Sequence, residues 1–144
     1  MSSRESIFAA LFALASGATG FATASRTLKS WDAVLPPDQP ALFQLEGKQH
    51  AKSAYRVGTV WTFRAELYVY VHIANTTAGA DLVSLLNTQV DAVVAALATP
   101  IGLDAQTLGG LVTDVRIDGD VETDEGRLGP QAVAIIPVLI TATN

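Results

Sequence analysis

The stretch WTFRAELYVYVHI, residues 61–73, decides the fold. Apolar side chains occupy every second position from Trp61 to Ile73, and the positions between them carry Thr, Arg, Glu, Tyr and His. Because side chains on a strand alternate between its two faces, this pattern predicts one long strand with an apolar face and an amphipathic face. The segment is longer than the usual strand of about 5–6 residues, so we expect long partner strands and a helical layer over the apolar face.

Residues 3–16 are predicted to form the first helix of that layer. Ile7, Leu11 and Leu14 recur at helical spacing, Ser2 and Glu5 are spaced as a capping box, and Gly17 is expected to close the helix in a left-handed conformation. The same stretch mimics a short secretory signal, with a basic residue before an apolar run and the triplet ALA before a serine. Glu5 offsets the basic residue, and the helical spacing favours a packing helix.

A second helix is predicted from Asp81, a plausible N-cap, to about residue 98, where Pro100 blocks its continuation. Its apolar stripe matches the 3.6-residue period and contains Leu82, Leu85, Leu86, Val90, Val93, Ala96 and Leu97.

The remaining segments complete one sheet. Strands are predicted over residues 21–29, 41–46, 60–74, 111–123 and 131–141, with a polar turn over 75–80 and a glycine-containing turn over 123–130. The last strand is apolar on both faces, which indicates a central position, although Pro137 argues for a bulge or an edge there. The order α-β-β-β-α-β-β predicts one α+β domain over residues 1–144, with two helices packed on a mostly antiparallel five-stranded sheet.

Composition limits the possible functions. The chain has 144 residues, of which 49% are hydrophobic and 16% charged, with a mean hydropathy of +0.33. No apolar run approaches the roughly 18 residues of a membrane span, so the surplus apolar surface is expected between subunits. The net charge of −5 disfavours a general nucleic-acid binder, and the absence of cysteine excludes disulfides and thiolate chemistry.

Residues 47–58 form the one basic segment of this acidic chain and are predicted to be a mobile hairpin loop. The segment contains Lys48, His50, Lys52 and Arg56, and no carboxylate. It could contact an acidic partner, or it could be a solvated hairpin tip.

Three side chains on the amphipathic face of the long strand, Arg64, Tyr68 and Tyr70, suit a subunit interface, because Arg and aromatic residues are enriched at interfaces. The alternative is ordinary packing against a neighbouring element.

Asp118, Asp120 and Glu122, followed by Asp124 and Glu125, are the one dense carboxylate cluster. Hard cations prefer grouped oxygen ligands, but strand alternation explains the spacing as a solvated face, and the calcium-loop pattern is not met. We therefore predict no metal site. Such an acidic strip, Asp118, Asp120 and Glu122, could instead line an aqueous channel that repels DNA phosphates.

A reactive constellation is not recognisable in the sequence. His50 and His72 are the two histidines, and the G-x-S-x-G, phosphate-loop and H-E-x-x-H patterns do not occur. We expect no catalytic residue and no cofactor.

The chain resembles the tail-terminator, or tail-completion, proteins of long-tailed bacteriophages. The resemblance rests on RESIFAALFAL at residues 4–14, WTFRAELYVYVH at residues 61–72 and DEGRLGPQAVAIIPV at residues 124–138. It implies a structural virion protein, not an enzyme, that forms a homohexameric ring on the tail tube, ends tube polymerisation and joins the tube to the head–tail connector.

The implied partners are other copies of the chain, the tail-tube protein and the connector, with DNA only as passing cargo and no membrane. The implied location is the virion, and the host cytoplasm during assembly. The alternatives are another neck, connector or tube protein of the same particle, or a small cytoplasmic ligand-binding domain or enzyme that uses the carboxylate cluster or His72.

Overall fold

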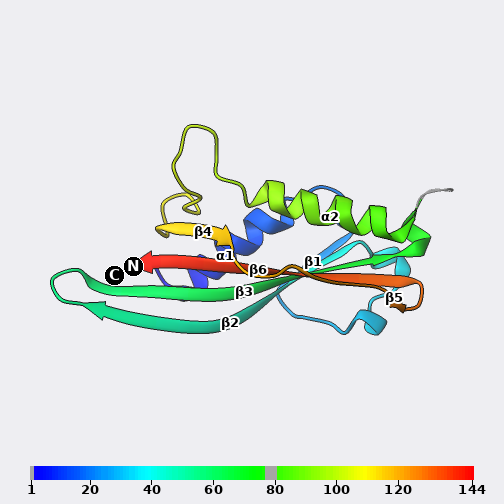
Figure 1. Ribbon diagram of the computed structural model, residues 1–144, viewed down its shortest axis with the longest axis horizontal. Coiled ribbons are helices and arrows are strands. Elements are labelled where there is room, and N and C mark those ends of the chain that lie inside the picture. The colour runs from blue at the N-terminus through cyan, green and yellow to red at the C-terminus, as the bar shows by residue number, and fades with distance from the viewer. Residues whose placement is uncertain (1, 77–80) are drawn as a thin grey trace.

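The computed structural model describes residues 2–76 and 81–144, which form two α-helices on one face of a six-stranded, mostly antiparallel sheet (Figure 1). The strand order is β1-β2-β3-β6-β4, and β5 pairs with β6 beside β4. The predicted α+β class is confirmed, with one strand more than the five expected. The elements are α1 (Arg4–Ser16), β1 (Thr23–Ser25), β2 (Ala41–Ala54), β3 (Gly58–His72), α2 (Leu82–Ala96), β4 (Asp114–Ile117), β5 (Glu122–Leu128) and β6 (Gln131–Thr143).

The long strand β3 is the middle of the sheet, as the alternating pattern predicts. It pairs antiparallel with β2 on one side and, along residues 60–72, with β6 on the other. Phe63, Leu67 and Val69 point to the helices and are fully buried, and they meet Ile136 and Ile140 from β6 in the same core. β6 is central, which confirms the expectation from its two apolar faces.

Helix α1 packs its apolar stripe on the sheet. Ile7, Phe8 and Leu11 are buried, and the ring of Phe8 meets that of Phe63 edge to face at 5.8 Å. The cap is Ser3, whose Oγ accepts from the backbone N–H of Ser6, so the predicted capping box from Ser2 is wrong by one residue. Gly17 has φ −73°, a right-handed conformation, so the left-handed end is also wrong.

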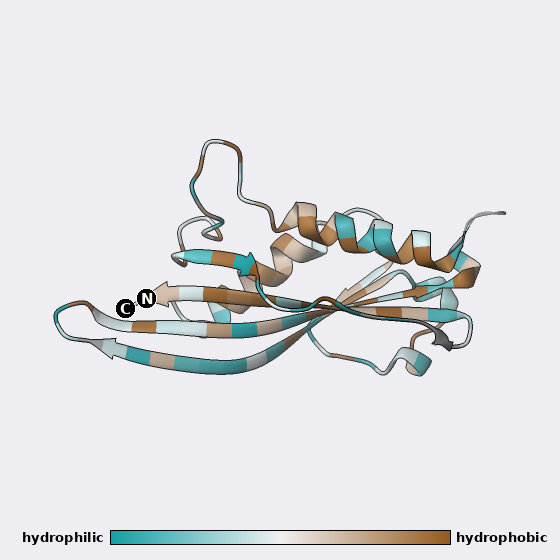
Figure 2. Ribbon diagram, in the orientation of Figure 1, coloured by the Kyte–Doolittle hydropathy of each residue, from teal (hydrophilic) through white to brown (hydrophobic). Residues whose placement is uncertain are grey.

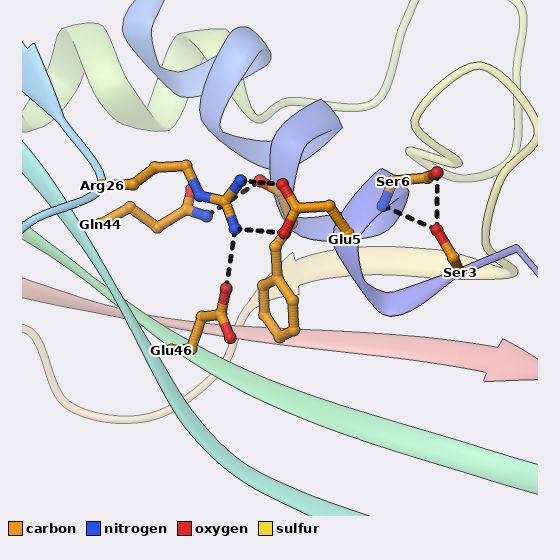
Figure 3. Close-up of polar contacts among 7 residues, drawn as sticks. Ser3, Glu5, Ser6, Arg26, Gln44 and Glu46 are labelled. Carbon is orange, nitrogen blue, oxygen red and sulfur yellow. Dashed lines mark hydrogen bonds and ion pairs between the residues drawn. The ribbon is translucent and has the colours of Figure 1, made fainter.

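Polar contacts fasten α1 to the first two strands (Figure 3). The guanidinium of Arg26 binds Glu5 of the helix at 2.5 Å and Glu46 of β2 at 2.8 Å, and this contact lowers the pKa of Glu5. Nearby, Gln44 Nε2 donates to the carbonyl of Phe8 at 2.9 Å. Helix α1 is therefore located on the sheet by directional bonds as well as by apolar packing.

Helix α2 lies beside α1 and covers β3 and β6 (Figure 1). Its predicted cap is confirmed, because the Asp81 carboxylate accepts from Ser84 N at 2.8 Å. Leu86 and Val93 from the predicted stripe are buried. Part of the turn predicted over residues 75–80 lies outside the described residues.

Strand β2 runs to Ala54, so the mobile loop predicted over residues 47–58 is wrong. After a bulge between Glu46 and Gln49, the strand stays in register with β3 up to the pair of Ala54 with Gly58. Because a tight turn joins β2 to the long β3, the two strands have similar lengths. The bulge at Gly47 interrupts the alternation of side chains in β2, so the pattern did not predict the second half of the strand.

The strand predicted over residues 111–123 is divided into β4 and β5. Gly119, at φ +123°, turns the chain between them, and β5 continues through most of the turn predicted over 123–130. Pro137 of β6 lies opposite this break, and its carbonyl accepts from Asp118 N at 3.2 Å. The backbone N and the carbonyl O of a strand residue point to the same side of the strand. The N–H that Pro137 lacks would therefore point to the break between β4 and β5, and the proline removes no hydrogen bond between β6 and β3.

Candidate functional site

The outer face of the sheet, which we define as the face away from α1 and α2, carries most of the candidate residues. Cross-strand register places Arg64, Glu66 and Tyr68 of β3 on it, beside Ile135, Pro137 and Leu139 of β6. The apolar side chains of this β6 row are half-buried, and Leu45 of β2 on the same face is 37% exposed. Figure 2 shows that β6 is largely apolar whereas the protruding part of the β2–β3 hairpin is mostly polar.

One end of the outer face is covered by the connection between β1 and β2. Val34 of this connection packs with Phe43 and Tyr70 in a second apolar cluster. The Tyr70 hydroxyl donates to the carbonyl of Lys29 at 2.7 Å, and burial raises the pKa of Tyr70 to about 12. With an exposure of 4%, Tyr70 packs against a neighbouring element of its own chain, which was the alternative to a subunit interface.

In the middle of the outer face, Arg64 and Asp118 bind each other. One guanidinium nitrogen of Arg64 lies 2.9 Å from the Asp118 carboxylate and donates to its carbonyl at 2.9 Å. A residue expected at an interface and a residue expected in the acidic strip therefore form one intrachain contact, which leaves both about half exposed.

The acidic residues do not form the predicted strip along one strand. Asp118 and Asp120 lie in the connection at Gly119, and Glu122 begins β5. The prediction failed because a positive-φ glycine interrupts the strand, so alternation does not continue across it.

Glu122 instead joins a different group, which we call the acidic depression. It is a surface hollow of about 460 Å³ lined by Val133 and Ile135 of β6, which we call its floor, and by Glu122, Thr123 and Asp124 of β5, which we call its rim. Glu122 lies opposite Ile135, which lies opposite Tyr68 of β3.

Tyr68 connects this region to Glu66 of β3. Its hydroxyl donates to Glu66 Oε2 at 3.0 Å. Partial burial, this hydrogen bond and the charges of Glu66 and Glu122 raise the pKa of Tyr68. Tyr68 thus remains half-buried beside two carboxylates and adjacent to the depression.

The opposite end of the molecule is basic. We call residues 50–59 the hairpin tip. His50 and Lys52 are exposed and pair with Thr62 and Val60, which places them on the outer face, and Lys48 sits in the bulge just before the tip. At the turn, the Arg56 guanidinium lies 5.2 Å from the centre of the Tyr55 ring.

The turn also exposes apolar groups. Tyr55 is 88% exposed and Val57 is 60% exposed. A tyrosine and an arginine together on a protruding turn have the composition of an interface anchor, and an exposed valine lies beside them. The turn between β2 and β3 and strand β5, which contributes the rim of the depression, lie at opposite ends of the long axis of the molecule (Figure 1).

The outer edge of β2 is open beyond its first residues. β1 pairs with Ala41, Leu42 and Phe43, and no other described strand pairs with β2 on that side. Edge strands present backbone groups to which another chain can pair, and lysine side chains and bulges are the usual protection against uncontrolled pairing. β2 has both a bulge and lysines, Lys48 and Lys52.

The histidines occupy unrelated positions. His72 ends β3, and its Nδ1 accepts from Ala74 N at 3.0 Å, so it caps the following turn, whereas His50 lies in the hairpin tip. Among residues 2–76 and 81–144, no group of three acidic or histidine side chains could hold a metal ion. Neither described helix is long and apolar enough to cross a membrane.

Comparison with known proteins does not assign a family: no protein-family model matches the chain, and no curated protein is significantly similar to it.

Sequence reasoning missed several residues of these surfaces. Tyr55 and Val57 were overlooked because the hairpin tip was considered only for its cations; two apolar residues beside a glycine turn were the available signal. Glu66 joins Glu122 and Asp124 only through the register of three strands, and no local pattern contains that information.

Proposed function

We propose that this chain is the tail-terminator subunit of a long-tailed phage, a structural protein that forms a ring, six-membered by the resemblance, on the last ring of the tail tube. The observation that carries the proposal is the outer face of the sheet. It bears an apolar row on β6 and an exposed Leu45, and the described part of the chain covers only one end of it.

The physical support comes from what such a face requires. An antiparallel sheet can leave one face in water when that face is polar, but half-buried Ile135, Pro137 and Leu139 favour contact with protein. The protruding hairpin and the open edge of β2 are further surfaces for subunit contact.

The sequence resemblance is carried by three separate segments of the chain. Its three segments form α1, most of β3 and the β5–β6 hairpin, which are the scaffold of the sheet. In this function the subunit acts sterically: each copy binds the end of the tube and offers no further tube subunit an equivalent acceptor.

The test is the solution mass of the purified protein, alone and mixed with the tail-tube protein of the same particle, followed by electron microscopy of the tubes. We expect a ring, formed alone or on tube ends, and tubes that stop growing when the protein is added. A monomer that neither binds tube ends nor limits their length would overturn the proposal.

A further inference from the structure

We infer that the hairpin tip of one subunit docks into the acidic depression of the next copy of the same chain. The inference rests on the proposed function for the ring context, but the contact itself is argued from the two surfaces. They differ in charge and shape, and each lacks a counterpart within its own subunit because they lie at opposite ends of the molecule (Figure 1).

Charge complementarity is the first argument. Lys52 and Arg56 belong to a segment without carboxylates, whereas Glu122 and Asp124 form the rim of the depression and Glu66 lies nearby on the same face. Complementary patches steer association and fix its register, so this pairing favours a head-to-tail contact over a random one.

Apolar complementarity is the second argument. Burial of the exposed Tyr55 ring and the Val57 side chain would be favourable, and Val133 and Ile135 provide an apolar floor in a hollow large enough for an aromatic ring. The guanidinium of Arg56 beside the Tyr55 ring would meet the carboxylates at the rim as the ring enters.

Symmetry is the third argument. A contact that joins two different patches is heterologous, and repeated heterologous contacts generate a closed ring when the rotation permits closure. The sequence did not reveal such a matched pair, because the depression exists only after β5 has paired with β6.

Single-cysteine variants test the contact without interference, because the natural chain contains no cysteine. Tyr55→Cys and Ile135→Cys are purified separately, mixed at ring-forming concentration, with the tube protein present if the ring requires it, and oxidised mildly. We expect a disulfide-linked dimer of Tyr55→Cys with Ile135→Cys only when the two variants are mixed. This dimer should be at least tenfold more abundant than the dimer in a control mixture of Ile101→Cys with Ile135→Cys.

The control is matched because Ile101 is also a fully exposed apolar residue on a loop, but it lies between α2 and β4. Glu122→Cys on the exposed rim replaces Ile135→Cys if the latter fails to fold. Cross-linking no stronger than this control, in a preparation that forms rings or binds tube ends, would overturn the inference and leave the proposed function standing.

A charge exchange provides the second readout. Lys52→Glu with Arg56→Glu should weaken subunit association about tenfold or more, and adding Glu122→Lys with Asp124→Lys in the partner should restore it. Weakening without restoration would overturn the inference. A variant carrying both cysteines should give covalent ladders that end at the ring size; a ladder that stops at two chains would keep the contact and overturn the ring.

Discussion

Arg64 and Asp118 bind each other through both the carboxylate and the backbone carbonyl of the aspartate, although 54 residues separate them in the chain. The contact connects the middle of β3 to the connection between β4 and β5, and so orients the segment that leads into the acidic depression. Within this contact the positive charge of Arg64 and the negative charge of Asp118 offset each other.

The contribution of this ion pair to stability should be small. Both side chains are about half exposed, and exposed pairs contribute about 0–1 kcal/mol. We expect Arg64→Ala and Asp118→Ala to show a coupling within that range in a double-mutant cycle of urea unfolding. A coupling above about 2 kcal/mol would contradict a solvent-screened pair.

Gly119 should be the sensitive residue of the same connection. At φ +123° a side chain is strained, and a Cβ would lie 3.2 Å from Pro137 Cγ. Gly119→Ala should lower the free energy of unfolding by about 1–3 kcal/mol. Gly109→Ala is the matched control, because Gly109 also has positive φ, +71°, but open space around it, and should cost less. Equal losses of unfolding free energy in the two variants would show that the contact with Pro137 does not contribute.

The buried amide of Gln44 should be replaceable by an apolar side chain of similar shape. Its Nε2 donates to Phe8, but its Oε1 has no hydrogen-bond partner. Gln44→Met loses one bond and also removes this unpaired oxygen, so we expect a change in unfolding free energy within about 1 kcal/mol. Gln44→Ala leaves a cavity and should cost about 2–3 kcal/mol. Thermal and chemical unfolding of both variants measure the difference; a Met variant as damaged as the Ala variant would show that the hydrogen bond dominates.

Alkaline pH should destabilise the protein through Tyr70. Its folded-state pKa of about 12 exceeds the value of about 10 expected in the unfolded chain, so the folded state holds the proton more tightly. The resulting stabilisation is complete below about pH 10 and is lost as pH rises to about 12, with a limit of about 2–3 kcal/mol. Tyr70→Phe should lose about 1 kcal/mol at neutral pH, for the bond to Lys29, and show a weaker decline above pH 10. Parallel slopes for the two proteins would contradict the assignment.

The elements of the fold that could be predicted are those with a periodic pattern of apolar residues in the local sequence. The alternation from Trp61 onward and the apolar stripe of α2 predicted their elements, because each repeats over many residues. The failures are at single positions that change the backbone: Gly47 in the β2 bulge and Gly119 between β4 and β5. The turn residues Asp118, Gly119 and Asp120 were a readable signal for the second break.

The candidate site was less predictable for a related reason. Lys52 and Arg56 could be identified as a basic group from sequence because they are neighbours in one segment. The depression brings Glu122 of β5 beside Ile135 of β6 and Tyr68 of β3, and this arrangement depends on two strand registers. Register is set by the whole sheet, so it cannot be read from any one of the three segments.

The central position of β6 has a consequence for biosynthesis. Among the described strands, residues 131–143 follow all the others in the chain, yet they complete both the buried core, through Ile136 and Ile140, and the floor of the acidic depression, through Ile135. Until they are added, β3 has no neighbour on that side and β4 and β5 have none at all. Long-range pairing of this kind makes folding wait for the C-terminal strand. A chain whose translation stops before that strand would lack the depression altogether, and under the inferred docking contact it could not accept the hairpin tip of a neighbouring copy.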